Sequence, residues 1–475
     1  MTARHATPVA APDTSAARPH PAVRSTASLG SAGGTSSPWI VAVFGIPLLV
    51  LFAVLCCPFP PLQDFLEWIY QGKVVAALLS GAPADGVRFA DYPVPNSATQ
   101  VALGLLTLAL PASVAAQVFL VAYVAAAVAV AWKISSRYQP AIAGPLCVVL
   151  LTTVFFNAPF WNGYTNYQIG LVLFCAWLAL DEDRRMAAGT LAAFGLAAFL
   201  VHLTAFVCLA TLAGLEALRS RRIRPALLGF APSAGLALWY AASMTRARFA
   251  PGAPPVDAQP DGASGLVLFA AYKAYTFLKA GPYHNFVFSS GGDAAVRPIA
   301  YWAGVGVNAA FAALLLAAFA GGAWTLWRVR STRAAPMLVA ASLFALVFLA
   351  LPAGRWVGNT GERFLYPALL LLLLCLPLRR TMVTALATLS LYFAVGLGGL
   401  ASSRAEWLVP VDPDWTSLQR VLFLHRPTTF VSRFEEVRRM EALGGAPRLP
   451  LAFETSVLLQ VPAAPSAPAH GAIAP

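Results

Sequence analysis

The stretch WIVAVFGIPLLVLFAVLCC, residues 39–57, decides the fold class because it runs for nineteen residues without a charge. A helix needs about 20 mostly apolar residues to cross a membrane. Similar runs recur at roughly 113–132, 141–157, 165–180, 188–201, 203–218, 224–243, 301–327, 335–352, 366–378 and 381–402. The sequence therefore predicts an all-α polytopic membrane protein with about eleven transmembrane helices. The short pair 188–201 and 203–218 leaves one broken or re-entrant element as an alternative.

The composition supports membrane insertion and excludes several other classes. Hydrophobic residues make up 59% of the chain and charged residues 11%, whereas a soluble domain carries about 25% charged residues. The formal net charge of +12 comes from short arginine clusters between apolar runs, which argues against nucleic acid as a partner. The six cysteines lie in or beside apolar runs and show no zinc spacing or disulfide framework.

The basic residues in the short loops predict the orientation. Lys and Arg concentrate in cytoplasmic loops. One set of alternate loops holds Lys133, Arg137, Arg184, Arg185, Arg219, Arg221, Arg222, Arg224, Arg328, Arg330, Arg333, Arg379 and Arg380. The rule places this set and a disordered tail, residues 1–38, in the cytoplasm of a bacterial cell, with the chain in its inner membrane. Loops 58–112, 244–300 and 353–365 and a short, partly disordered C-terminal segment, 403–475, are then periplasmic. Amphipathic spacing predicts two short helices in that segment, around 415–422 and 430–440.

The first periplasmic segment carries the main candidates for catalysis. Asp64, Glu67 and Gln71 share one face of a helix expected to start near Leu62 and to lie at the membrane interface. Carboxylates beside an apolar surface suit general-base catalysis, because partial desolvation raises their pKa. The alternative is an ordinary solvated helix face. Asp91 is a third candidate, or else a turn residue before Pro93. A second interfacial helix is expected at 98–110.

Polar and aromatic residues in other periplasmic loops are candidates for binding. Trp161, Asn162, Tyr164 and Asn166 suit contacts with a carbohydrate, although aromatic residues also gather at the level of the lipid headgroups. His202, between two apolar runs, is a candidate anion ligand, or a residue satisfied by a backbone carbonyl.

In the remaining loops, two arginines are candidates for phosphate binding, whereas an acidic cluster is not a candidate metal site. Arg355 and Arg363 suit a phosphate group, or instead reach to the interface or pair with Glu362. The cluster 181–183, Asp-Glu-Asp, resembles a nucleotide-sugar metal motif, but the orientation places it in a short cytoplasmic turn beside two arginines.

Three stretches give the chain a resemblance to the GT-C superfamily of membrane glycosyltransferases. They are Asp64 soon after the first span, followed by a Tyr-Pro turn at 92–93 and a second interfacial helix; the broken hairpin at 194–206; and Arg-Phe-Leu-Tyr-Pro at 363–367. The chain also resembles a large group of bacterial polytopic membrane proteins through Pro-x-x-Asp at 61–64, Trp-Asn-Gly-x-x-Asn-Tyr at 161–167 and His-Leu-x-Ala-Phe at 202–206. The resemblance covers most of 39–380. It implies a GT-C-like transmembrane domain over 39–402 and a donor sugar carried on polyprenyl phosphate.

The resemblance also implies roles for the candidate residues. Asp64 takes the position of the catalytic base, and Arg363 holds the donor phosphate with Arg355 or His202. Phe65 stands where many relatives place a second acidic residue, so the use of a divalent metal ion stays open and its ligands unknown. The implied reaction transfers the sugar to a periplasmic envelope glycolipid or polymer. One alternative is a transporter or lipid flippase. Such proteins typically have charged residues in the middle of their spans and two repeated halves, and the sequence shows few such charges and no repeat. Another alternative is a non-catalytic membrane scaffold.

Overall fold

The structure is a computed structural model that describes residues 37–55, 62, 64–82, 86–248, 263–283, 298–329, 334–351, 360–394, 428–449, 451 and 458–460. About 82% of these residues are helical. The strands in this part are two residues long: β1 (Arg88–Phe89) pairs antiparallel with β2 (Leu459–Gln460). The predicted all-α class is confirmed. The predicted disordered tail 1–38 and the last residues of the chain lie almost wholly outside the described ranges.

Within the described ranges, five helices are long and apolar enough to cross a membrane. They are α1 (Ser37–Leu55), α4 (Ala112–Tyr138), α10 (Leu203–Ser220), α11 (Ile223–Arg248) and α14 (Pro298–Val329). In the apolar window of α11 only 11% of the residues are buried by the rest of the protein. Such a large exposed apolar surface requires lipid around it. The chain is therefore an all-α membrane protein.

The remaining helices are too short to settle the number of spans. The shorter apolar ones are α3 (Ala98–Thr107), the broken run of η1 (Pro140–Ile142), α5 (Ala143–Leu150) and η2 (Leu151–Phe155), then α7 (Thr165–Leu178), α9 (Ala188–Val201), α12 (Ala263–Leu278) and α15 (Ala335–Ala350). Three other helices belong to the same body: α6 (Ala158–Trp161), α16 (Glu362–Cys375) and α17 (Arg380–Ser390). The total of about eleven spans stays a prediction. α12 falls within the predicted loop 244–300, where no helix was expected.

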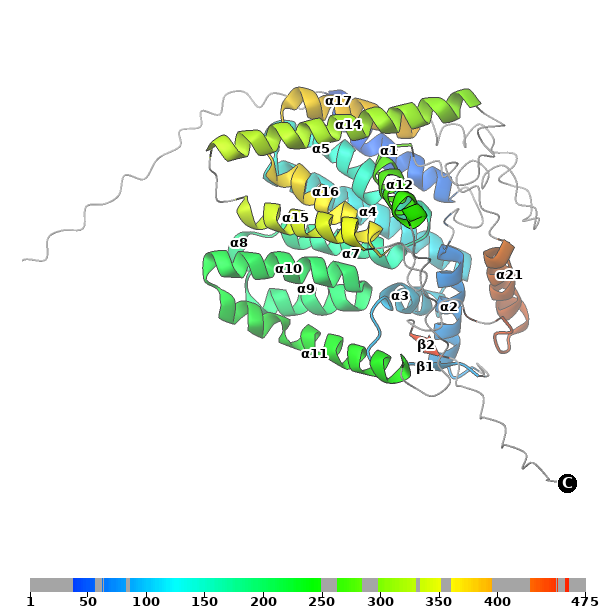
Figure 1. Ribbon diagram of the computed structural model, residues 1–475. Coiled ribbons are helices and arrows are strands. Elements are labelled where there is room, and N and C mark those ends of the chain that lie inside the picture. The colour runs from blue at the N-terminus through cyan, green and yellow to red at the C-terminus, as the bar shows by residue number, and fades with distance from the viewer. Residues whose placement is uncertain are drawn as a thin grey trace, which may run out of the picture.

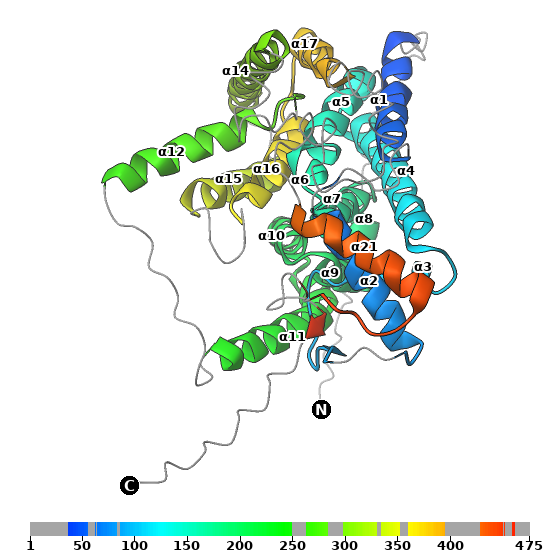
Figure 2. The same ribbon diagram turned by 90° about the vertical axis from the view of Figure 1, so that its right-hand side faces the viewer.

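Most helices lie side by side, and shorter elements close the two ends (Figure 1). At one end α2 (Phe65–Leu79), α3 and α21 (Thr428–Leu443) gather with the two strands, and α8 (Glu182–Arg185) lies at the other end. In the turned view α21 crosses α2 (Figure 2). The helix expected after the first apolar run is present and begins at Phe65, three residues after Leu62, while its place at the membrane interface stays a prediction. α21 confirms the second tail helix, and the first, at 415–422, lies outside the described residues.

The pair α9 and α10 forms a hairpin with a single residue at its tip. His202 has extended backbone angles, φ −165° and ψ 125°, between the end of one helix and the start of the next. The two helices then pack against each other along their length (Figure 1). The short pair of apolar runs is therefore broken at His202, as the alternative interpretation of this segment allowed.

Candidate functional site

Asp64 lies at the residue just before α2. Its backbone N–H donates to the carbonyl oxygen of Asn162 at 2.9 Å, and its own carbonyl oxygen accepts from the N–H groups of Glu67 and Trp68. Its side chain makes no capping hydrogen bond to the first turn of α2, although aspartate commonly does so at this position. The backbone of Asp64 is therefore fixed, while its carboxylate is left for another partner.

The loop before α7 determines where Asp64 lies. Gly163 has a φ of +81°, and an added Cβ atom would lie 2.5 Å from the backbone nitrogen of Phe65 and 2.7 Å from that of Asp64. Only glycine fits both the conformation and the space. Trp68 adds a hydrogen bond from its indole Nε1 to the carbonyl oxygen of Gly163 at 3.0 Å. The Trp-Asn-Gly motif therefore positions the start of α2 through backbone contacts.

Arg363, the second residue of α16, faces the same region from the other side. Its guanidinium carbon lies 5.2 Å from the centre of the Tyr164 ring, and its backbone carbonyl oxygen accepts from the Tyr167 hydroxyl at 2.9 Å. Its Nε is buried and has no hydrogen-bond partner among the described residues. The guanidinium is thus held over an aromatic face and keeps free donors.

His202 contacts Arg363 with its imidazole ring. Its Nδ1 accepts a hydrogen bond from the backbone N–H of Thr204 at 3.1 Å, which caps α10. Burial, and the nearby charge of Arg363, hold the pKa of His202 well below its usual value, so the ring is neutral. A neutral ring that accepts at Nδ1 must carry its hydrogen on Nε2.

The consequence is that two donors point at each other. Nη1 of Arg363 lies 3.3 Å from Nε2 of His202. An arginine donates only, and this histidine nitrogen also carries a hydrogen, so neither atom can accept from the other. Two converging donors without an acceptor form a site that an anionic oxygen can complete.

The electrostatic environment of Asp64 suits proton transfer near neutral pH. Burial raises the pKa of Asp64 from 3.8 to about 7, the charge of Arg363 lowers it, and that of Glu67 raises it. Within the described part of the chain, no hydrogen bond or ion pair engages its carboxylate. Arg363 therefore acts on Asp64 without a direct ion pair. Asp64, Arg363 and His202 are thus brought to one place, as the sequence suggested.

Glu67 has a structural role, which corrects its interpretation as a second catalytic carboxylate. It is fully buried and forms an ion pair with Nε of Arg433 at 2.9 Å, while Nε2 of Gln71 donates to its other oxygen at 2.8 Å. The helical face with Glu67 and Gln71 is neither solvated nor open to a ligand, because α21 covers it. Arg433 is 366 residues away in sequence, and no local pattern indicates this partner.

Three further candidates lie outside the cluster. Asp91 is exposed in a bend of the chain. Trp161 is 1% exposed, and its indole N–H donates to the carbonyl oxygen of Phe156 at 3.1 Å, so its ring is part of the core. Asn166 accepts from the backbone N–H of Thr99 at 2.9 Å and donates to the carbonyl oxygen of Asn96 at 2.8 Å. In these positions Trp161 and Asn166 hold helices together and do not offer a ligand contact.

The other candidates divide between the site and the undescribed part. Asn162 contributes its backbone carbonyl oxygen to Asp64, and Tyr164 contributes its ring to Arg363. Arg355 lies outside the described residues. Over the described ranges, no group of three or more His, Cys, Asp or Glu residues could hold a metal ion. Tyr167 belongs to the motif at 161–167 but was not predicted as a site residue, although its ring and that of His202 form a T-shaped pair with 5.3 Å between ring centres.

No protein-family model, curated protein or solved structure matches this chain. The GT-C resemblance therefore depends on the short motifs alone, and what is established is an all-α membrane protein with a cluster of Asp64, Arg363 and His202.

Proposed function

We propose that the chain is a membrane glycosyltransferase of the GT-C type, which moves a sugar from a polyprenyl-phosphate donor to a hydroxyl group of an envelope acceptor. One observation carries the proposal. The carboxylate of Asp64, which has no hydrogen-bond partner among the described residues and a pKa of about 7, lies near the guanidinium of Arg363, which with His202 offers two unsatisfied donors. A general base and an anion site side by side are what transfer from a phosphate leaving group requires.

The roles follow from the chemistry of these groups. Asp64 takes the proton of the acceptor hydroxyl as the acceptor oxygen forms a bond to the anomeric carbon of the sugar. The bond from that carbon to the phosphate oxygen breaks, and its electron pair stays on the polyprenyl phosphate. Arg363 and Nε2–H of His202 then stabilise the negative charge that develops there. Direct displacement inverts the anomeric configuration.

The pKa of Asp64 supports this role quantitatively. A base works best when its pKa is near the working pH, because it is then both largely ionised and still basic. A carboxylate with an ordinary pKa near 4 would be fully ionised but about a thousandfold less basic than one near 7. The burial of Asp64 therefore makes it a stronger base, at a cost to the stability of the folded protein.

The position of the cluster at the ends of apolar helices suits a lipid-linked donor. The polyprenyl chain is apolar and is stable only in lipid, while its phosphate must reach polar donors. Asp64 follows α1 by a few residues, and His202 immediately precedes the membrane-spanning α10. The cluster therefore lies where apolar helices end, which suits a ligand with one apolar and one charged part.

Asp64→Asn in the full-length protein tests the proposal. Expressed in a strain lacking the chromosomal gene, it is expected to lose envelope sugar transfer by about 10²- to 10⁴-fold, as the loss of a general base does. The readout is the sugar content of envelope glycolipids and polymers, by mass spectrometry. Asp91→Asn is the matched control, because Asp91 is an exposed carboxylate of the same loop, and it is expected to behave as the unsubstituted protein.

Two results would contradict the proposal. One is an envelope sugar profile that is the same for Asp64→Asn, for the deletion strain and for the intact protein. The other is a normal sugar profile with a lost gradient of a transported solute, which would identify a transporter. Immunoblots of membrane fractions establish that each variant is present in equal amount.

A further inference from the structure

The opposite end of the molecule contains a second polar site. α8 precedes α9 and His202 follows it, and the 14 residues of α9 span about 21 Å. The two sites are therefore separated by the length of a helix (Figure 1). The C-terminal ends of α4 and α10 and the N-terminal end of α15 meet α8 here.

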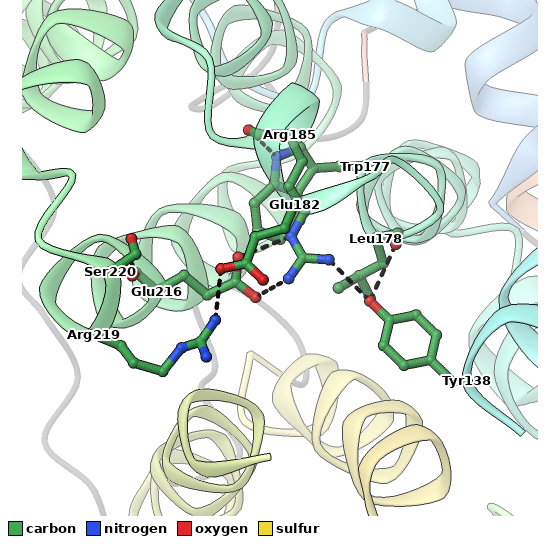
Figure 3. A network of polar contacts seen from close by, with 8 residues as sticks. All are labelled: Tyr138, Trp177, Leu178, Glu182, Arg185, Glu216, Arg219 and Ser220. Carbon is green, nitrogen blue, oxygen red and sulfur yellow. Dashed lines mark hydrogen bonds and ion pairs between the residues drawn. The ribbon is translucent and has the colours of Figure 1, made fainter. Parts of the chain in front are cut away.

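The inner part of this second site is a saturated ion pair (Figure 3). Arg185 donates from Nε to Glu216 Oε2 at 2.8 Å and from Nη2 to Oε1 at 2.5 Å, and only 8% and 3% of the two side chains are exposed. Nη1 of Arg185 donates to the Tyr138 hydroxyl at 3.2 Å, and that hydroxyl donates to the carbonyl oxygen of Leu178. These groups satisfy one another and form a rigid floor.

The outer part is an exposed pair with spare binding capacity. Nη2 of Arg219 lies 2.7 Å from Oε1 of Glu182, and 34% and 47% of the two side chains are exposed. This is the single contact between them, so Arg219 keeps other N–H groups for a ligand. Exposed pairs of this kind contribute little to stability and exchange readily.

Both pairs line one cavity. Its volume is about 280 Å³, and the ends of four helices supply the lining: Tyr138, Glu182, Arg185, Glu216, Arg219, Pro336 and Met337. Clefts for drug-sized molecules have volumes of about 300–1,000 Å³. The cavity is therefore of a size for a small polar head, and not for a nucleotide sugar.

The charges of the lining itself balance, but the charge of this end of the molecule favours an anion. Segments 133–137, 181–185 and 216–224 contain eight basic and four acidic side chains. Each acidic side chain already has an arginine partner: Arg137 with Asp181, Arg185 with Glu216, Arg219 with Glu182 and Arg222 with Asp183. The other four basic side chains, Lys133, Arg184, Arg221 and Arg224, have no ion-pair partner among the described residues. A net excess of four positive charges remains at this end.

Exposed apolar residues lie close in sequence to the lining, on the same helices α10 and α15. Leu218, beside Arg219, is 64% exposed, and Val339, one turn after Pro336, is 45% exposed. A ligand with its charged head in the cavity can therefore lay apolar chains along α10 and α15. Basic pockets between membrane helices bind acidic lipid headgroups in this way.

We propose that this cavity holds the phosphodiester head of an anionic phospholipid, with Arg219 as the direct contact. On binding, the phosphate replaces Glu182 as the partner of Arg219, while the pair of Arg185 and Glu216 stays intact as the floor. The surrounding basic side chains favour an anionic over a zwitterionic head. The inference is independent of the transferase proposal, because the two sites share no residue.

Lipid titration of the full-length protein in detergent tests this inference. Short-chain phosphatidylglycerol is added to delipidated protein, and bound lipid is counted by native mass spectrometry, with phosphatidylcholine as the zwitterionic comparison. Phosphatidylglycerol is expected to bind at least about fivefold more tightly than phosphatidylcholine, and Arg219→Gln to weaken its binding by about fivefold or more. Glu182→Gln is expected to strengthen it, because the competing carboxylate is gone.

Arg222→Gln is the matched control, since Arg222 has a similar exposed pair, with Asp183, but does not line the cavity. It is expected to change binding less than Arg219→Gln. Equal losses for Arg219→Gln and Arg222→Gln would mean general surface attraction and overturn the site. Weaker binding in Glu182→Gln, or equal affinity for both lipids, would overturn the anionic head. All substituted residues are partly exposed, so a change in folding is not expected, and circular dichroism checks this.

Discussion

The two ends of the molecule use the same kinds of side chain in opposite ways. At the α8 end, Asp181, Glu182, Asp183 and Glu216 each have an arginine within ion-pair distance. At the α2 end Glu67 is paired in the same way with Arg433, but the carboxylate of Asp64 has no ion-pair partner among the described residues, although Arg363 is near enough to lower its pKa.

The difference indicates which charges serve folding and which are available for chemistry. A buried paired charge is neutralised and oriented by its partner, and little of it remains for a ligand, whereas an exposed pair can exchange its partner. An unpaired, largely buried carboxylate beside unsatisfied donors destabilises the folded state and persists only if the surrounding structure holds it. The α2 end therefore has the properties of an active site, whereas the α8 end has a structural floor and, of its exposed pairs, one that lines the cavity.

Substituting an arginine at each end should give the largest difference, which is a difference in the free energy of unfolding. Arg185→Gln leaves Glu216 buried without its partner and is expected to lower the free energy of unfolding by about 3–5 kcal/mol. Arg363→Gln removes no ion pair among the described residues; it removes the contact with the Tyr164 ring, while the approach to His202 is between two donors, so a loss of about 1 kcal/mol is expected. Melting of both variants in the same detergent measures the difference. A larger loss for Arg363→Gln would break the comparison.

Glycine substitutions test how tightly the α2 end is positioned. Gly163→Ala places a methyl group 2.5 Å from the nitrogen of Phe65 and should displace Asp64, with a loss of sugar transfer of about a hundredfold. Gly81, at the other end of α2, has a similar φ of +72° but nothing within 4 Å of an added Cβ. Gly81→Ala therefore carries the backbone strain alone and should keep its activity. Equal activities would show that the loop at 161–163 does not position Asp64.

Local sequence patterns were sufficient for part of this architecture. Apolar runs predict helices wherever the chain meets lipid, because the bilayer imposes the same condition on each segment. The break at His202 was allowed as an alternative, because the two apolar runs on either side of this polar residue are short. Asp64 and Arg363 were selected from motifs, and the structure brings them together with His202.

Contacts between distant segments were beyond the sequence. The polar face of Glu67 and Gln71 looks the same whether water, a ligand or another helix covers it. The answer depends on Arg433, 366 residues away. Helix length was equally uncertain, because the π-helical turn η2 ends the run at 141–157 early. Tertiary packing, and not composition, decides which partner covers a polar helix face and where a helix ends.

The pKa of Asp64 gives a pH test of the α2 end. Sugar transfer should rise with pH to half its maximum near pH 7. At pH 5 it should be roughly fiftyfold lower than at pH 7, because only the ionised carboxylate acts as a base.

The stability of the folded protein should fall, and not rise, over the same pH range. The folded protein keeps its proton up to about pH 7 and the unfolded chain loses it near 3.8, so stability falls between these values. Asp64→Asn should therefore melt higher than the unsubstituted protein above pH 7 but not below pH 4. A half-maximum near pH 4 would contradict the buried, unpaired state of Asp64.

The smallest expected effect concerns the ring that supports Arg363. Tyr164→Leu removes the aromatic face 5.2 Å from the guanidinium and should lower sugar transfer by about two- to fivefold, the size of a cation–π contact of about 0.5–1 kcal/mol. Tyr164→Phe keeps the face and is expected to retain more activity than Tyr164→Leu. If the two variants lose activity equally, the ring does not support Arg363, and its orientation must come from α16 and the hydrogen bond of Tyr167 to its carbonyl oxygen. The α2 end would then position its cation by backbone contacts alone, as it does its carboxylate.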